Sequence, residues 1–152
     1  LAQRVKAGQT VRIEGPYGRF QLARSKPDSR QIWVAGGIGV TPFLAWLESL
    51  QACPEEAREA DLHYCTRNHE SDPFVDRLQT LCAALPGIRL SIHSAKHGDV
   101  LTADALKLAE GQKKKADVWF CGPSGLADAL KKGLKDSWNG RLCFHQEAFE
   151  MR

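Results

Sequence analysis

The chain has 152 residues, the size of one ordinary domain with a hydrophobic core of its own. Hydrophobic residues make up 43% of the chain and charged residues 26%, which is typical of a globular protein. The net charge of +3 is too small to indicate nucleic-acid binding. No apolar run reaches the ~18 residues of a membrane helix. Composition therefore favours a globular domain and is compatible with an anionic small ligand.

The first residues, LAQRVKAGQTVRIEGPYGRF, begin in the middle of a pattern and alternate like a strand at Val11 and Ile13. They are typical of the end of a preceding domain. A regular pattern begins only after Lys26 and Pro27, so we place a domain boundary there.

Beyond residue 27, short apolar runs alternate with helical patterns. Strands are expected at 31–36, 61–66, 88–94, 116–122 and 141–145, and helices at 41–50, from Asp72-Pro73 onward, at 102–109 and at 123–135. Continuous apolar runs are typical of buried parallel strands, which are joined by right-handed helical crossovers. The sequence predicts an α/β fold: a Rossmann-like five-stranded parallel sheet of order 3-2-1-4-5, with helices on both faces.

The motif GGIGVTP joins the first strand to the first helix. Gly37 and Gly39 allow the backbone to approach a pyrophosphate, which the free amides of a helix start then bind. Thr41 is the expected N-cap, and Pro42 falls in the first helical turn, where its missing N–H costs nothing. A tight turn with no ligand also explains this motif. A P-loop is excluded because no GK[ST] follows the glycines.

The second strand ends in CTRN and lacks the acid that usually binds a ribose 2′-hydroxyl. Arg67 would instead suit the 2′-phosphate of NADP through charge-assisted hydrogen bonds. A surface arginine without a ligand is an equally good explanation.

The motif CGPSG repeats the strand–turn–helix arrangement after the fourth strand. The carboxyl ends of strands one and four face one crevice in such a sheet, so the two glycine turns are expected to meet there. Cys121 has no paired cysteine and no histidine at a spacing that indicates a dyad. We therefore expect it to pack against a ligand and not to act as a nucleophile.

The five cysteines are spread along the chain without a CxxC pair, and reduced thiols are expected (Cys53, Cys65, Cys82, Cys121 and Cys143). His93 and His97 have i,i+4 spacing, but HSAKHGD is typical of a loop after a strand. Zinc needs three or four converging ligands, so no metal site is predicted.

In this order, GPYGRF, AGGIGVTP, YCTRN, CGPSG and FHQEAF resemble the NAD(P)-binding half of ferredoxin–NADP reductase-type flavoproteins. The likeness is greatest to the ferric reductase and NADPH oxidase branch and spans nearly the whole chain. It implies that residues 1–26 are the end of a truncated FAD-binding barrel and its hinge. Residues 27–152 would be the NAD(P)-binding domain.

The resemblance also implies roles for individual residues. The pyrophosphate and nicotinamide ribose would lie along the first turn (Gly36, Gly37, Ile38, Gly39, Val40, Thr41 and Pro42). The adenosine end would lie near Thr66 and Arg67, and the nicotinamide beside Cys121, Gly122 and Pro123. Phe149 would cover the flavin with Glu147 nearby, so that Cys121, Glu147 and Phe149 flank the reacting rings. In several relatives the aromatic ends the chain, whereas Glu150-Met151-Arg152 follow it here.

The activity implied by the resemblance is hydride transfer from NADPH (or NADH) to FAD in the intact protein. Electrons would then pass to haem, in an attached membrane domain, or to a ferric acceptor. The chain would be a cytoplasmic domain of an inner-membrane or membrane-associated protein. Without its flavin barrel it is expected to bind the nucleotide but do no chemistry. A non-catalytic NAD(P)-sensing module is the alternative, whereas an enzyme acting on a small substrate is disfavoured by the missing acid–base residues.

Overall fold

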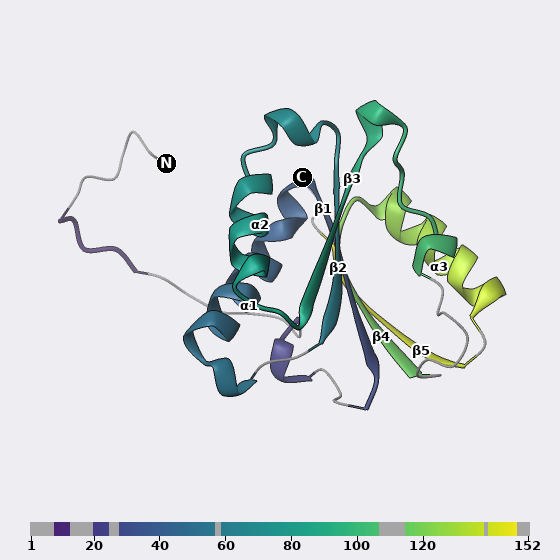
Figure 1. The fold of residues 1–152 in the computed structure, drawn as a ribbon, viewed down its shortest axis with the longest axis horizontal. Helices are drawn as coiled ribbons and strands as arrows, with labels where there is room; N and C mark the ends of the chain where they lie inside the picture. The colour runs from purple at the N-terminus through teal and green to yellow at the C-terminus, as the bar shows by residue number, and fades with distance from the viewer. Residues whose placement is uncertain are drawn as a thin grey trace.

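A computed structural model describes residues 8–12, 20–24, 28–56, 59–106, 115–138 and 140–148 (Figure 1). Within these ranges the fold consists of five strands and three α-helices: β1 (Arg30–Gly36), α1 (Thr41–Ala52), β2 (Ala60–Thr66), α2 (Val75–Ala83), β3 (Ile88–Ser94), β4 (Lys115–Gly122), α3 (Ser124–Ser137) and β5 (Arg141–Ala148). Short 3-10 turns connect them, among them η2 (Gly37–Val40), η4 (His69–Ser71), η5 (Ala95–His97) and η6 (Asp104–Leu106).

All four strand pairs of the sheet are parallel, and the strand order is β3-β2-β1-β4-β5. The predicted Rossmann-like order 3-2-1-4-5 is therefore confirmed. β1 lies in the centre and pairs with β2 on one side and β4 on the other, with Gly36 opposite Cys65 and Ala35 opposite Cys121. Two neighbouring strands thus end side by side, at the point where the strand order reverses.

Helices cover both faces of the sheet, as predicted (Figure 1). α1 and α2 lie on one face over an aromatic-rich core that includes Trp33, Phe43 and Trp119. α3 lies on the other face over a smaller aliphatic core that includes Ile32, Val118 and Leu130. Burial of these two apolar layers against the central strands is the main stabilising contribution to the fold.

The prediction of a helix over 102–109 is wrong where the structure describes it. Residues 104–106 form only the 3-10 turn η6, and residues 107–109 lie outside the described ranges. Leu101 and Leu106 are both buried in the smaller core, and the carbonyl of Leu106 accepts a hydrogen bond of 3.2 Å from Arg30. These contacts tie the connection between β3 and β4 to the sheet without a regular helix.

Two further expectations concern the ends of the chain. β5 runs to Ala148, three residues beyond the expected end at His145, because it pairs with β4 as far as Gly122. Phe149 and most of GPYGRF lie outside the described residues. Among the described helices, none has both the length and the apolar composition needed to cross a bilayer.

Candidate nucleotide-binding site

The two glycine turns are in direct contact at the carboxyl ends of β1 and β4. A Cβ atom on Gly39 would lie 2.2 Å from the carbonyl oxygen of Cys121, and one on Gly36 would lie 2.6 Å from Cδ of Pro123. Real Cβ atoms essentially never come that close, so both positions need glycine for the turns to pack. Gly37 differs, because its φ of +55° is left-handed and no atom lies within 4 Å of its Cβ position. The turn is therefore closed towards β4 and open at Gly37.

The start of α1 differs from the prediction. Thr41 has φ −57° and ψ −43°, which is helical, and no side chain caps the helix. The prediction of Thr41 as N-cap is wrong, because Val40, the last residue of η2, already has helical φ and ψ and η2 runs directly into α1. Pro42 does lie in the first turn, as predicted. The first free amides of this combined helical segment therefore belong to η2 and not to Thr41.

The other predicted residues of this turn differ in their exposure to solvent. Val40 is fully buried in the aromatic-rich core, so its side chain anchors the turn to that core and does not face a ligand. Ile38 is 60% exposed and Thr41 is exposed. Ile38 and Thr41 are therefore the side chains here that a bound nucleotide could contact.

The end of β2 is organised by Asp72, an acid that the sequence analysis did not assign. Its carboxylate accepts hydrogen bonds from the Thr66 hydroxyl, from the Tyr64 hydroxyl at 2.8 Å and from the Phe74 amide at 2.9 Å. The hydroxyl proton of Thr66 is thus already used within the protein. Asp72 follows β2 in the sequence, as a ribose-binding acid would. Its carboxylate does not have that role, because its hydrogen bonds fix the β2–α2 connection.

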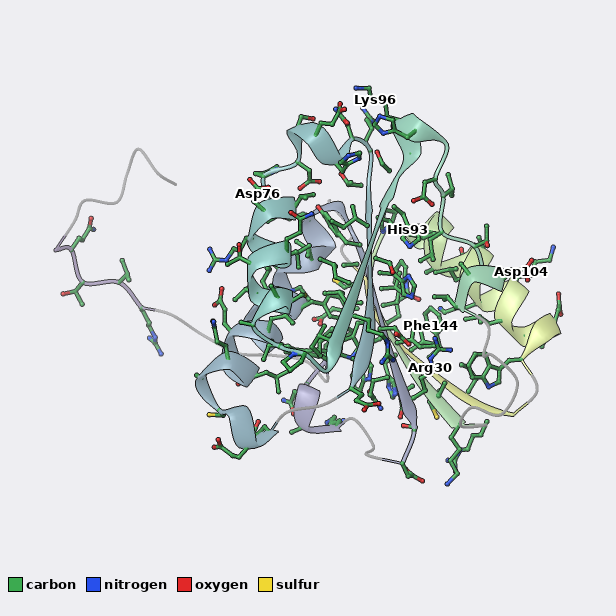
Figure 2. All side chains as sticks on the ribbon, viewed as in Figure 1. Arg30, Asp76, His93, Lys96, Asp104 and Phe144 are labelled. Carbon is green, nitrogen blue, oxygen red and sulfur yellow. The ribbon has the colours of Figure 1, made fainter. Side chains whose placement is uncertain are left out.

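Arg67 is exposed immediately beyond β2, and its guanidinium has no hydrogen-bond or ion-pair partner within the described ranges. Its carbonyl accepts a 2.8 Å hydrogen bond from the amide of Lys96 in η5. Lys96 in turn forms a 3.1 Å ion pair with Glu70 in η4. Charged side chains therefore gather at the carboxyl ends of β2 and β3. Figure 2 shows Lys96 at that end of the molecule.

His93 and His97 do not converge on one site. His93 faces the α3 side of the sheet, where its Nδ1 lies 3.0 Å from Asp99 and its Nε2 lies 3.1 Å from Nδ1 of His63 (Figure 2). His97 instead pairs with Ser94 at 3.1 Å. Within the described ranges, no three His, Cys, Asp or Glu side chains are grouped as metal ligands.

At the end of β4, Cys121 contributes its backbone to the site. Its side chain is fully buried, and burial, with a smaller effect of the Glu147 charge, raises the pKa of the thiol to about 11. A protonated, buried thiol is a poor nucleophile, which agrees with the expectation from its sequence context. Gly122 is also buried, whereas Pro123 is exposed at the start of α3. Glu147 lies opposite Cys121 on β5 and is half-buried.

All five cysteines are free thiols, as predicted. Burial raises the pKa of Cys65 to about 12 and that of Cys82 to about 11, so these two are protonated at neutral pH as well.

The α1 side of β4 and β5 carries a cluster of polar and aromatic side chains that belongs to none of the sequence motifs. His145 stacks on Trp119 with ring centroids 4.0 Å apart, and its Nε2 lies 3.0 Å from Asp117. Burial would raise the pKa of Asp117, but hydrogen bonds from Ser29 and His145 outweigh it and hold the pKa below its usual value. Phe20, from the segment before the sheet, also packs on Trp119, at 5.3 Å. The signal in the sequence was the alternation of Cys143, His145 and Glu147 along β5.

Comparison with known proteins gives one family and a consistent set of relatives. The model of the oxidoreductase NAD-binding domain matches residues 33–132. The vanillate O-demethylase oxidoreductase of Pseudomonas putida is 32% identical over 98% of this chain and 44% of its own length. The flavohemoprotein of Pseudomonas putida is 32% identical over 89% of this chain and 35% of its own. The chain thus spans less than half the length of these curated relatives.

Solved structures support the same fold. The flavohemoglobin of Malassezia yamatoensis with bound FAD and heme has a TM-score of 0.72 at 21% identity, over 93% of this chain and 39% of that one. The cytochrome b5 reductase domain of Ulva prolifera nitrate reductase also has a TM-score of 0.72, at 18% identity, over 96% of this chain and 62% of that one.

Proposed function

Because the chain belongs to the oxidoreductase NAD-binding domain family, we propose that it is the nucleotide-binding part of a flavin-dependent NAD(P)H oxidoreductase of the ferredoxin–NADP reductase type. The observation that carries the proposal is the contact between the two glycine turns, Gly36–Gly39 and Cys121–Pro123. The pyrophosphate is bound at the open side of the first turn, near Gly37 and the amides of η2. The nicotinamide lies beside Gly122 and Pro123.

The adenosine end of the nucleotide is proposed to lie over the carboxyl edge of β2. Arg67 supports this because it is an exposed cation without a partner among the described residues. A 2′-phosphate would give its guanidinium charge-assisted hydrogen bonds, which favours NADPH over NADH. Thr66 is assigned a supporting role, since its hydroxyl is bonded to Asp72.

The flavin is proposed to be bound by a preceding domain, of which residues 1–26 are the end, and to face the α1 side of β4 and β5. Phe20 supports this arrangement because it brings the preceding segment onto Trp46, at 4.9 Å, and onto Trp119. Glu147 lies on the same side, opposite Cys121. Phe149, outside the described residues, is proposed to cover the flavin ring.

The chemistry fits a site without acid–base residues. NAD(P)H supplies a hydride, and its transfer to a flavin depends mainly on the alignment of two rings. The residues of this chain bind and orient the nucleotide, while the thiol of Cys121 stays protonated and buried beneath it. Electrons are proposed to continue to haem or another acceptor, since relatives include a flavohemoprotein and a flavohemoglobin with bound FAD and heme. A haem-binding membrane domain as the acceptor, with this chain on its cytoplasmic side, belongs to this proposal.

The nucleotide assignment is tested by titrating the protein with NADPH and NADH before and after Arg67→Ala. The affinity for NADPH is expected to fall about 10- to 100-fold, the equivalent of ~1.5–3 kcal/mol for hydrogen bonds to a charged group. The affinity for NADH should change less than about threefold. Arg77→Ala is the matched control, because the Arg77 guanidinium is already paired with Glu48 on α1. An unchanged NADPH affinity in Arg67→Ala would refute the assignment of the arginine.

A further inference from the structure

A second concave site lies between the C-terminal half of α3 and the edge strand β5. Its volume is about 300 Å³, in the lower range of small-ligand pockets. It is separate from the nucleotide site, because the glycine turns lie at the carboxyl ends of the strands while Leu142 lies near the amino end of β5. We call it the α3–β5 groove and define it by Lys131, Leu134, Lys135, Trp138, Leu142 and Phe144.

The floor of the α3–β5 groove is apolar. Leu134 is fully buried, whereas Trp138, Leu142 and Phe144 pack on the smaller core and remain partly exposed. Figure 2 shows Phe144 on the side of the sheet that faces α3. β5 is the edge strand of the sheet within the described ranges, so the floor lies at the border of the sheet. The floor therefore suits the apolar body of a ligand.

The rim of the groove is positively charged. Lys131 and Lys135 are exposed and one helical turn apart on α3, so both ammonium groups can reach the same side of the groove. Lys131 lies over the ring of Phe144, with Nζ 5.1 Å from the centroid, and donates a hydrogen bond to Gln146. No carboxylate in the described residues forms an ion pair with either lysine. The rim thus offers positive charge that no carboxylate of the described residues neutralises by an ion pair.

Trp138, at the end of α3, adds an unsatisfied donor. Its indole Nε1 is hidden from solvent and has no hydrogen-bond partner within the part of the chain that the structure describes. A buried donor without a partner costs about 1–3 kcal/mol. Because Trp138 lines the groove, a ligand oxygen that accepted this hydrogen bond would remove that cost.

We propose that the α3–β5 groove binds a small amphipathic carboxylate, with the apolar body on Leu142 and Phe144 and the carboxylate between Lys135 and the Trp138 indole. The body is either an aromatic ring or a short aliphatic chain, because the floor offers both kinds of surface. This site is independent of the nucleotide and of the proposed function. An acidic protein segment is the competing occupant, but the small volume of the groove favours a small molecule.

The test is a calorimetric titration of the intact protein with 2-naphthoate and with octanoate, which distinguishes the aromatic from the aliphatic body. At least one is expected to bind saturably with a Kd of about 1 mM or tighter. The neutral analogue 2-naphthamide should bind about tenfold more weakly than 2-naphthoate, because it loses the charge-assisted contacts. Lys135→Gln should weaken carboxylate binding about tenfold, and Trp138→Phe about threefold or more. Lys132→Gln is the matched control, since Lys132 is exposed on the same helix but does not line the groove.

The proposal is overturned if neither acid binds saturably, if the amide binds as well as the acid, or if Lys135→Gln binds like the unchanged protein. Binding of an acidic peptide without binding of either small acid would also overturn it in favour of a protein partner. Because Trp138→Phe could disturb the end of α3, the exposed Lys135 keeps the test decisive, with unfolding midpoints confirming that each variant is folded.

Discussion

Replacing Gly39 by alanine perturbs the contact on which the proposed nucleotide site depends. The new methyl group would lie 2.2 Å from the Cys121 carbonyl oxygen and 2.9 Å from the Gly122 nitrogen. Ordinary contact begins at 3.4 Å, so the two turns must separate by about 1 Å. Both opposing atoms belong to the backbone, so no side chain can rotate away. Overpacking of this kind costs about 1–3 kcal/mol of unfolding free energy, which lowers Tm by about 2–12 °C at this chain length.

Urea unfolding and NAD(P)H titration measure the two consequences of Gly39→Ala. The free energy of unfolding should fall by the same ~1–3 kcal/mol. The affinity for the nucleotide should also fall, because the two binding turns are displaced. Gly125→Ala is the matched control, since Gly125 lies in α3 with no atom within 4 Å of its Cβ position. That variant should be stabilised by at most about 0.5 kcal/mol, because Gly125 lies in the first turn of α3 and not in its interior. If Gly39→Ala unfolds at the same urea concentration as the unchanged protein and binds the nucleotide equally well, the glycine contact has no role in stability or in nucleotide binding.

Two other predictions concern side chains that the structure brings together. Burial, with the nearby His93, lowers the pKa of His63 from 6.5 to about 4, so between these values the unfolded chain binds a proton that the folded protein does not. The free energy of unfolding should therefore fall by up to about 3 kcal/mol as the pH drops from 6.5 to 4. The urea midpoint of His63→Gln should depend less on pH than that of the unchanged protein. An equal pH dependence of the two midpoints would contradict this. Asp72→Ala removes the acceptor for Tyr64, Thr66 and Phe74, and should cost about 2–4 kcal/mol of unfolding free energy; a loss below ~0.5 kcal/mol would show that these hydrogen bonds are unimportant.

Much of the fold was predictable because each central strand is a continuous apolar run. The run expected at 116–122 lies within the buried strand β4, which the structure extends by one residue to Lys115, and both glycine turns lie where the strand order reverses. The family resemblance is confirmed as well. The predicted likeness to the ferric reductase and NADPH oxidase branch was less accurate. Relatives such as the Pseudomonas putida reductase and flavohemoprotein belong to a somewhat different branch from ferric reductases.

The failures have physical causes that a linear pattern does not contain. Thr41 fits the N-cap preference, but the preceding GIGV turn is itself helical, so the cap position moves to Val40. The expected helix after Thr102 is replaced by a 3-10 turn, because Leu106 is held by the core and by Arg30 from a distant strand. The charge cluster of Lys96 and Glu70 depends on two connections meeting in space. Long-range contacts decided the last two of these features, whereas the start of α1 depends on the adjacent turn η2.

We propose that NAD(P)H bound to this chain delivers a hydride to a flavin within the intact protein. Anaerobic stopped-flow measurement of flavin absorbance in the FAD-loaded intact protein tests it most directly. NADPH is expected to bleach the flavin band in a saturable, single-turnover reaction, and Gly39→Ala is expected to slow it at subsaturating nucleotide. If the protein binds FAD and the nucleotide but neither NADPH nor NADH bleaches the flavin, the chain is a sensing module and the proposed hydride transfer is wrong.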